Sequence, residues 1–328
     1  MTVRVPDYFL KFKCIADRCT DSCCIGWEID IDGKAQSKYA SLDGKLGAEI
    51  REKTQHGYFP LQKNGRCAFL DDRGLCRIIS SLGDGYLCDI CKEHPRYYGV
   101  GHGCLEGGIG LACPEAARII LSIKEQPKFL YTEASPPYES EDEFAAECER
   151  LRELTYGAIY KCRTDELLSE ILHIARYADE LAFCLTSGLE VPRFDEAESP
   201  DADIERLIEL SFDAFFDSEI MSDEWSARFD RARKTLTKDS LTKSIEDNAT
   251  SFRALLFYFT HRYIRECITD MTVGAKVVFS LLSSILIFAL ADTYESDPIE
   301  KAAVLFSKNI EYSTENIDAA VEEICEVL

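Results

Sequence analysis

The chain has 328 residues, of which 46% are hydrophobic and 29% are charged, and this composition is typical of a folded protein. Its formal net charge is -22, and the excess arises after Cys113: residues 1–113 hold 15 basic and 15 acidic residues, whereas residues 114–328 hold 22 and 44. A nucleic-acid partner requires a basic surface that replaces the counterions of phosphate, so neither part predicts binding to DNA or RNA.

The length exceeds that of one compact core and predicts two domains, or one domain with a large helical extension. We expect a Cys-rich domain over residues 1–126 and an acidic helical domain over residues 127–328. The first 13 residues include Arg4, Asp7 and Lys11 and contain no apolar run of signal-peptide length. The sequence therefore predicts a cytoplasmic location.

Ten of the fifteen cysteines lie in the first 113 residues, and we predict all ten as candidate metal ligands: Cys14, Cys19, Cys23, Cys24, Cys67, Cys76, Cys88, Cys91, Cys104 and Cys113. Disulfides, a metal site and a catalytic dithiol are the three alternatives. A disulfide framework is typical of short secreted domains, whereas clustered thiols in a reducing compartment favour zinc or an iron–sulfur cluster. The spacing favours a metal but leaves its identity and the number of centres open.

The first cysteine group, Cys14-x4-Cys19-x3-Cys23-Cys24, places four sulfur atoms within eleven residues. Hydrophobic and acidic residues alternate over residues 27–32, which predicts a short strand directly after this loop. Adjacent cysteines cannot easily bind one ion without strain. We therefore expect Cys23 and Cys24 to point in different directions.

The second group comprises Cys67, Cys76, Cys88 and Cys91. The Asp-Asp-Arg-Gly sequence at residues 71–74 predicts a turn that brings the first two sulfur atoms together. The Cys-x2-Cys spacing of the other two is common in metal knuckles. The strict Cys-x3-Cys-x2-Cys triad of radical S-adenosylmethionine enzymes is absent, which disfavours a radical mechanism of that usual type.

Two glycine-rich stretches, residues 99–103 and 107–110, do not form a GxGxxG dinucleotide fingerprint after a strand, and we predict a surface loop there. Pro114 suits the first position of a helix, so Cys113 would be its N-cap, where the helix dipole favours a thiolate.

Apolar residues at helical spacing dominate the rest of the chain and predict helices at 114–125, 141–160, 164–187, 202–217, 223–237, 248–268, 273–293, 298–310 and 314–327. We predict a loop or linker at residues 188–200. The uncharged stretch Val277–Ala291 is shorter than a membrane span and predicts a buried core helix. The predicted fold is mainly α: a small, irregular, metal-binding Cys-rich domain with a few short strands, packed on an all-helical domain.

Several of these motifs resemble known families. Cys19-x3-Cys23-Cys24, Cys67-AFL-x5-Cys76 and Cys88-x2-Cys91-x3-Pro95-Arg96 resemble the CxxCxxCC-type zinc- or iron-chelating family. More closely, the chain resembles the flagellin lysine-N-methylases, a likeness also carried by residues 6–14, 23–29, 113–118, 256–263 and 311–316.

This resemblance implies methyl transfer from S-adenosylmethionine to lysine side chains of a flagellin-like protein, with an iron–sulfur cluster, preferentially [4Fe–4S], on the N-terminal cysteines. From charge and hydropathy, we predict neither a nucleic-acid nor a membrane partner. The alternative is a non-enzymatic metal-binding or interaction protein, in which a structural zinc ion stabilises the fold of the N-terminal segment.

Four residues that follow Cys91 are candidates for the chemistry of methyl transfer. Arg96 would hold the carboxylate of S-adenosylmethionine bidentately, or else pair with a structural carboxylate. Lysine methylation needs a neutral amine and a route for the lost proton. We predict His94, Tyr97 and Tyr98 as the catalytic side chains that line this route, although most tyrosines are ordinary packing residues.

Overall fold

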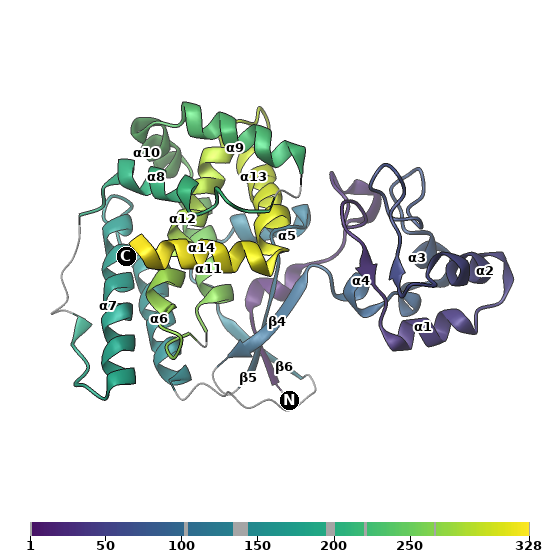
Figure 1. The fold of residues 1–328 in the computed structure, drawn as a ribbon, viewed down its shortest axis with the longest axis horizontal. Helices are drawn as coiled ribbons and strands as arrows, with labels where there is room; N and C mark the ends of the chain where they lie inside the picture. Colours follow the sequence, from purple (N-terminus) through teal and green to yellow (C-terminus); the bar gives the residue numbers. More distant parts are fainter. Residues whose placement is uncertain are drawn as a thin grey trace.

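The computed structural model describes residues 2–101, 104–133, 144–194, 201–219, 222–265 and 267–327. They form two lobes of unequal size (Figure 1). Residues 23–93 make up a small lobe, here the Cys-rich lobe, and residues 2–12 and 95–327 make up the large lobe. The protein is mainly helical and has a small sheet built largely from its N-terminal region, as predicted, but residues 129–133, in the part predicted to be all-helical, form a strand of this sheet. The metal-binding nature of the N-terminal region stays a prediction.

The Cys-rich lobe consists of short elements around a small core: β2 (Ile29–Asp30), α1 (Gly33–Ala40), α2 (Gly44–Lys53), β3 (Tyr58–Phe59), α3 (Arg77–Leu82) and α4 (Asp89–Glu93). Asp32 fixes the starts of two helices, because its carboxylate accepts hydrogen bonds from the Ala35 amide at the start of α1 (2.9 Å) and from the Asp89 amide at the start of α4 (2.8 Å). The predicted strand at 27–32 is confirmed as the shorter β2. The predicted turn after Cys67 closes with a bridge between Leu70 and Cys76.

The sheet of the large lobe has the order β4-β5-β1-β6, from β1 (Thr2–Pro6), β4 (Arg96–Gly101), β5 (Cys104–Ile109) and β6 (Phe129–Glu133). Strand β1 runs parallel to β5, with Val3 opposite Leu105, and antiparallel to β6. The chain thus leaves the large lobe after β1, forms the Cys-rich lobe, and returns to the same sheet at β4. The Cys-rich lobe is an insertion between two strands of one sheet.

The prediction of a glycine-rich surface loop is wrong, because the described glycines at 99, 101, 107 and 108 belong to the antiparallel pair β4 and β5. The glycines are required for close packing. A Cβ atom at Gly99 would lie 1.8 Å from Nη1 of Arg265, and one at Gly108 would lie 2.3 Å from the hydroxyl of Tyr97. Because these glycines have no side chain, the guanidinium of Arg265 fits against Gly99 and the ring of Tyr97 fits against Gly108. Residues 102 and 103 lie outside the described part.

The helices of the large lobe are α5 (Pro114–Leu121), α6 (Ala145–Lys161), α7 (Leu167–Ser187), α8 (Ile204–Asp213), α9 (Asp223–Thr235), α10 (Lys238–Asp247), α11 (Ala249–Tyr263), α12 (Val273–Ala291), α13 (Pro298–Phe306) and α14 (Thr314–Val327). All nine predicted helices are present within a few residues of their predicted ends. Helix α10 was not predicted. The predicted loop at 188–200 follows α7, and its residues 195–200 lie outside the described part.

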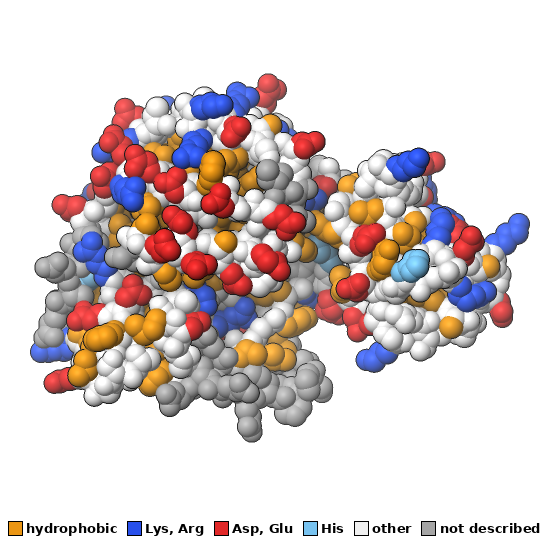
Figure 2. Space-filling model, in the orientation of Figure 1, with side chains coloured by type: hydrophobic (Ala, Val, Ile, Leu, Met, Phe, Trp, Pro, Cys, Tyr) orange, Lys and Arg blue, Asp and Glu red, His pale blue; other side chains and the backbone are white. Residues whose placement is uncertain are grey.

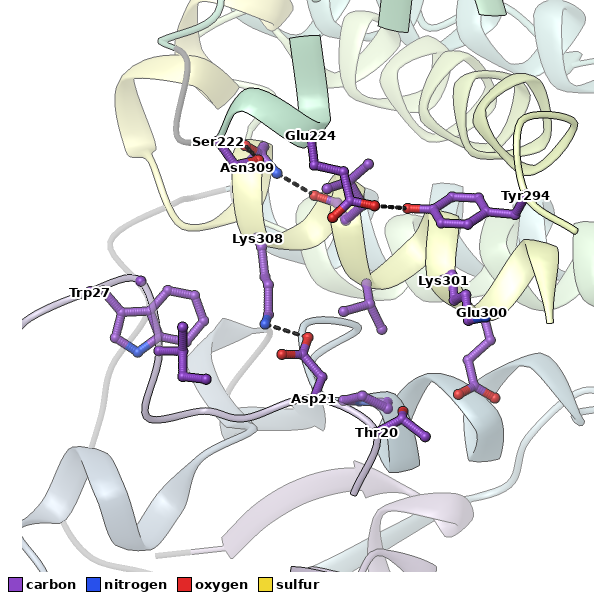
Figure 3. A pocket seen from close by; sticks show the side chains of 15 residues that line it. Thr20, Asp21, Trp27, Ser222, Glu224, Tyr294, Glu300, Lys301, Lys308 and Asn309 are labelled. Carbon is purple, nitrogen blue, oxygen red and sulfur yellow. Dashed lines mark hydrogen bonds and ion pairs between the residues drawn. The ribbon is translucent and has the colours of Figure 1, made fainter. Parts of the chain in front are cut away.

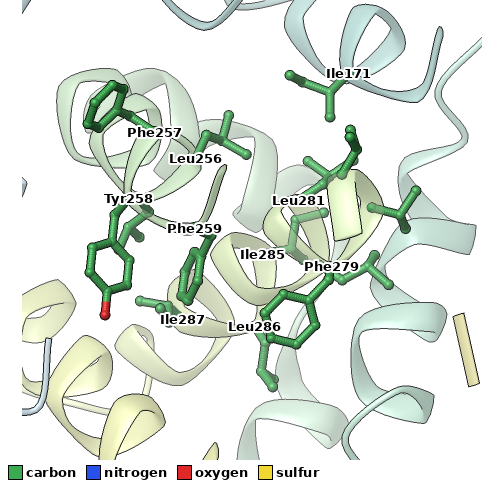
Figure 4. Close-up of a cluster of buried hydrophobic side chains, with 14 of the residues drawn as sticks. Ile171, Leu256, Phe257, Tyr258, Phe259, Phe279, Leu281, Ile285, Leu286 and Ile287 are labelled. Carbon is green, nitrogen blue, oxygen red and sulfur yellow. The ribbon is translucent and has the colours of Figure 1, made fainter. Parts of the chain in front are cut away.

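Helix α12 is the centre of the large lobe and packs against α7, α8, α11, α13 and α14. It is long and apolar enough to cross a membrane by composition alone, but 94% of its most apolar window is buried within the protein, as predicted for a core helix. Phe259 of α11 meets Phe279 of α12 edge to face, with ring centroids 6.1 Å apart (Figure 4). Asp and Glu side chains are spread over the visible outer face of this lobe (Figure 2).

The core of the large lobe includes Val3 and Val5 of β1 and Ile109 of β5 together with the helices. The core of the Cys-rich lobe is separate and extends from Ile29 to Cys88. The division into residues 1–126 and 127–328 stays a prediction about folding units. The residues at both ends of the predicted Cys-rich domain, such as Val3 and Ile119, pack in the core of the large lobe.

A buried ion cluster attaches the sheet to α6. Both Glu106 of β5 and Arg152 of α6 are 1% exposed, and their side chains form two hydrogen bonds, at 2.5 and 2.7 Å. Arg4 of β1 binds the same carboxylate at 3.1 Å. Burial alone would raise the pKa of Glu106, but the hydrogen bonds and the charge of Arg152 lower it to about 2.

We predict that Glu106→Gln destabilises the protein by about 3 kcal/mol at neutral pH, because it leaves the buried charge of Arg152 with only the partly exposed carboxylate of Glu149 as an anionic partner. Urea unfolding measures this difference. An unfolded glutamate has a pKa of about 4.3, so the difference from the wild type should shrink as the pH falls from there toward 2, where the wild-type carboxyl is also protonated.

The matched control is Asp165→Asn, which removes an exposed ion pair with Arg163 (side chains 63% and 74% exposed) and should leave the unfolding midpoint unchanged. Equal midpoints for Glu106→Gln and Asp165→Asn would contradict the assignment of the buried cluster as a stabilising anchor.

Candidate functional site

The two lobes meet where the chain segment 20–27 faces the C-terminal end of α13. Here the α-helix continues as a π-helical turn, Ser307–Glu311. Such turns are rare and occur frequently at functional sites. The side chains of this turn and of the next residue have different partners: Lys308 and Tyr312 contact the segment 20–27, whereas Glu311 is buried against α11.

A cavity of about 490 Å³ lies at this junction (Figure 3). One wall comes from the segment that carries the first cysteines, and the opposite wall comes from α9, α13 and the π-helical turn. The lining residues include Asp21, Trp27, Glu224, Tyr294, Glu300 and Lys308. A cavity of this size lies within the range of small-molecule binding sites. We call it the junction cavity.

Polar contacts fix the walls of the junction cavity. The ammonium of Lys308 donates to the carboxylate of Asp21, and the two side chains are 19% and 33% exposed. The hydroxyl of Tyr294 donates to Glu224 at 3.1 Å, and the hydroxyl of Ser222 donates to the amide oxygen of Asn309 at 3.1 Å. The dashed lines in Figure 3 mark these three contacts.

Trp27 is held by an aromatic partner from the large lobe. Its ring stacks on that of Tyr312, with centroids 4.8 Å apart and planes inclined by 2°. The Tyr312 hydroxyl lies 3.2 Å from Nδ1 of His94, while Nε2 of His94 is buried without a partner in the described part of the chain. His94 therefore does not line the junction cavity but contacts Tyr312, which in turn stacks on the lining residue Trp27.

The electrostatics of His94 favour its neutral form. Burial, with a smaller contribution from the charge of Lys308, lowers the pKa of His94 to about 4. An imidazole with this pKa is a weak proton acceptor at neutral pH. Its geometry suits the positioning of Tyr312 through a hydrogen bond.

A buried polar group lies behind the π-helical turn. Glu311 accepts hydrogen bonds from the hydroxyls of Tyr258 and Tyr263, both at 2.8 Å, and pairs with Arg262 at 3.3 Å. Arg262 also lies over the ring of Tyr97, 4.3 Å from its centroid. The Tyr97 hydroxyl has no hydrogen-bond partner among the described residues, and burial raises its pKa to about 12.

Arg96 and Tyr98 lie on the other face of β4, since successive strand residues point to opposite sides. The Arg96 guanidinium lies over the rings of Phe9 (5.5 Å) and Phe12 (5.3 Å). Tyr98 is 46% exposed, and its hydroxyl donates to Glu93 at 3.2 Å. The structure therefore brings Tyr97 and His94 toward the π-helical turn but separates them from Arg96 and Tyr98. All four functional assignments stay predictions.

Five of the predicted ligands gather in the core of the Cys-rich lobe, and we call them the deep thiol group: Cys24, Cys67, Cys76, Cys88 and Cys91. Cys67 and Cys88 are buried in this core, and the other three pack against it. Burial, followed by the neighbouring charges of Cys76 and other thiols, raises the pKa of Cys67. The thiols of Cys88 and Cys91 share a hydrogen bond.

Four more cysteines are neighbours of one another, and we call them the junction thiol group: Cys14, Cys19, Cys23 and Cys113. Cys19 and Cys113 directly precede Thr20 and Pro114, which line the junction cavity. Cys113 is the N-cap of α5, with Pro114 at the first helical position, as predicted. Burial raises the pKa of Cys113 to about 11, and Cys19 and Cys23 are among its charged neighbours. Cys104 belongs to neither group, because it lies near Glu106 and Arg4 of the buried ion cluster.

The neighbours of Cys23 and Cys24 differ, although their thiols share a hydrogen bond. Lys308 and Asp21 influence the charge of Cys23, whereas Cys67 and Cys76 influence that of Cys24. The adjacent cysteines therefore connect the two thiol groups.

The donor chemistry of both thiol groups suits a thiophilic metal, and all fifteen cysteines are free. Among the described residues, however, no three Cys, His, Asp or Glu side chains converge closely enough to hold one ion. The thiols are arranged as pairs and looser groups rather than as a closed coordination site. Ligation by the ten cysteines stays a prediction.

Sequence reasoning missed the residues that form the junction cavity. Asp21 and Lys308 are separated by 287 positions, and neither belongs to a motif of its own. Trp27 belongs to a predicted strand and to the family likeness, and Tyr312 belongs to the likeness alone, so neither pattern predicts that the two rings stack. The position of Asp21 between Cys19 and Cys23 was the one available signal.

Comparisons with known proteins point to one family. The chain is 33% identical over 136 residues to the flagellar biosynthetic protein FliU of Salmonella muenchen, covering 37% of this chain and 78% of FliU. It is 32% identical over 136 residues to the lysine-N-methylases of Salmonella typhimurium and Salmonella choleraesuis. The chain spans 33% of the length of each of these two relatives. No protein-family profile and no solved structure matches the chain.

We predict that His94 stays neutral in the folded protein well below its ordinary pKa of 6.5. The unfolded chain takes up this proton near pH 6.5 and the folded chain near pH 4, so His94 should cost stability as the pH falls through this window. Ring signals of labelled histidine, followed by NMR and assigned with His94→Gln, measure the titration. A midpoint near pH 6.5 would show that the ring is not desolvated.

Proposed function

The chain belongs to the lysine-N-methylase family, and on this basis we propose that it is a protein-lysine N-methyltransferase. A flagellin-like protein is the proposed substrate, because the relatives include a protein named for flagellar biosynthesis. The proposed location is the cytoplasm, where thiols remain reduced. The junction cavity is the proposed site of reaction.

The lining of the junction cavity is the observation that carries this proposal. A lysine side chain ends in an ammonium on an apolar stem. Aromatic faces such as those of Trp27 and Tyr294, combined with the carboxylates of Asp21 and Glu300, attract this combination. The acidic surface of the large lobe adds a weak long-range attraction for a lysine-bearing protein.

S-adenosylmethionine, when bound, supplies the methyl group. The lysine nitrogen must first lose a proton, because its lone pair forms the new carbon–nitrogen bond as the carbon–sulfur bond breaks. Burial and the charge of Asp297 raise the pKa of Glu300, which makes its carboxylate a better proton acceptor than an ordinary glutamate. We assign proton acceptance to Glu300, with His94 positioning the cavity wall through Tyr312.

The guanidinium of Arg96 has no ion pair within the described part of the chain, and this supports its proposed role toward a carboxylate. Tyr97 keeps its proposed role as a phenol near the site, whereas Tyr98 lies on the opposite face of β4 and would act only outside the junction cavity. Tyr97 is the better placed of the two, because its ring contacts Arg262 and Tyr258 next to the π-helical turn.

The thiols are proposed to hold an iron–sulfur cluster, preferentially [4Fe–4S], or zinc. The deep thiol group lies in a core much smaller than that of the large lobe, where a bound metal would add stability. Binding there requires the thiol pairs to close around the metal. Cys24 directly follows Cys23 and lies three residues before Trp27, which lines the junction cavity. A metal bound to Cys24 would therefore also fix one wall of this cavity.

The second candidate function is a non-enzymatic protein in which zinc only stabilises the Cys-rich lobe. The observation in its favour is that Cys67 and Cys88 are buried in the core of this lobe and do not line the junction cavity. The visible absorption of anaerobically purified protein distinguishes the two. A brown preparation indicates iron–sulfur, and a colourless one with stoichiometric zinc favours the structural role.

We predict that incubation with S-adenosylmethionine and flagellin adds methylene-sized mass increments to flagellin lysines, as measured by mass spectrometry of digested flagellin. Glu300→Gln should slow this transfer at neutral pH, because it removes the proposed proton acceptor. The matched control is Glu295→Gln, which changes an exposed carboxylate on the loop before α13. A fully metallated preparation that leaves flagellin unmodified argues against the enzyme.

We also predict that Cys67→Ser and Cys23→Ser lower the bound metal, as measured by elemental analysis of anaerobically purified protein. Cys184→Ser is the control, because Cys184 is buried in α7 of the large lobe and belongs to neither thiol group. Unchanged metal in both test variants would remove these two residues from the set of ligands.

A further inference from the structure

The junction cavity already contains a lysine side chain of the protein itself. Lys308 extends from the π-helical turn toward the opposite wall, and its ammonium reaches the carboxylate of Asp21 (Figure 3). The same ammonium lies 5.4 Å from the centroid of the Trp27 ring. The ammonium is therefore held by a negative charge and an aromatic face.

The contacts with Asp21 and Trp27 together form a binding site for an ammonium group. Charge-assisted hydrogen bonds to a carboxylate and contacts with the face of an indole are the two strongest ways in which proteins recognise an alkylammonium. The ring of Tyr312 stacks on Trp27 and holds the plane of the indole. Asp21 and Trp27 come from the segment that enters the Cys-rich lobe, whereas Lys308 comes from the large lobe.

We propose that Asp21 and Trp27 form the subsite that recognises the side-chain ammonium of an incoming lysine, and that Lys308 occupies this subsite until the substrate displaces it. The identification of the incoming group as a substrate lysine rests on the proposed function. The ability of the subsite to bind an alkylammonium does not.

Exchange of Lys308 for an external lysine is physically reasonable. The Lys308–Asp21 pair is partly exposed, and such pairs hold weakly against competition from water and other ions. Lys308 acts as an internal competitor. An external ammonium binds only to molecules in which Lys308 has left the subsite, so its apparent affinity is the intrinsic affinity multiplied by the fraction of such molecules. Removal of Lys308 should then expose the full affinity of Asp21 and Trp27.

The test uses the fluorescence of Trp27, which requires no methyl transfer. The chain has two tryptophans, so Trp225→Phe, which replaces a buried ring of α9, leaves Trp27 as the single reporter. The probes are Nα-acetyl-lysine amide and, as a neutral control of similar shape, Nα-acetyl-norleucine amide. Lys308→Met in this background should bind the lysine probe about tenfold more tightly than the parent.

Lys301→Met is the matched control, because Lys301 lines the same cavity but donates to Ser296 at 2.8 Å. It should leave the affinity unchanged, and adding Asp21→Asn to Lys308→Met should abolish the gain. A folded Lys308→Met variant that shows no saturable response, or responds equally to the norleucine probe, overturns the proposal. Lysine binding without flagellin methylation would instead contradict the proposed function alone.

Circular dichroism establishes whether each variant is folded. If Lys308→Met does not fold, the comparison moves to the chain that retains Lys308. There the lysine probe should still saturate at higher concentration, and Asp21→Asn should remove the response. Equal responses of these two chains would overturn the proposal.

Discussion

Burial of the Glu311 carboxylate is the constraint on which the junction between the lobes depends. Its side chain has no solvent exposure, and the donors that compensate this burial, Tyr258, Arg262 and Tyr263, all come from α11. A buried carboxylate is stable only when such donors surround it. The π-helical turn is therefore held in one orientation against α11. Lys308, three residues earlier, consequently faces the segment that leads into the Cys-rich lobe.

The helices of the large lobe were predictable because their apolar periodicity is long and regular, as in α12. Helix α10 was missed because Leu241 and Ile245 are its only buried residues, too few for a periodic signal. The glycine-rich stretch was misjudged for a different reason. Glycine permits both loops and close packing, and the choice here depends on Tyr97 and on Arg265, which is far away in the sequence.

The candidate site was predictable only in its local parts. Cysteine spacing identified the ligand candidates, and the position of Pro114 identified the N-cap at Cys113. The junction cavity depends on contacts between residues almost 300 positions apart, and no local pattern encodes such pairs. The alternation of β4 also separates Tyr97 from Tyr98, whereas the sequence presents them as neighbours with one role.

The insertion of the Cys-rich lobe between two strands of one sheet affects the order of assembly. Strand β1 is synthesised first, but its partners β5 and β6 follow about a hundred residues later. During synthesis, the complete Cys-rich lobe leaves the ribosome before β1 finds a neighbour. Closing the sheet then joins the two ends of a long loop, a step whose entropic cost rises slowly with loop length. The lobe that carries six of the ten predicted metal ligands is therefore free to organise before the sheet that anchors it exists.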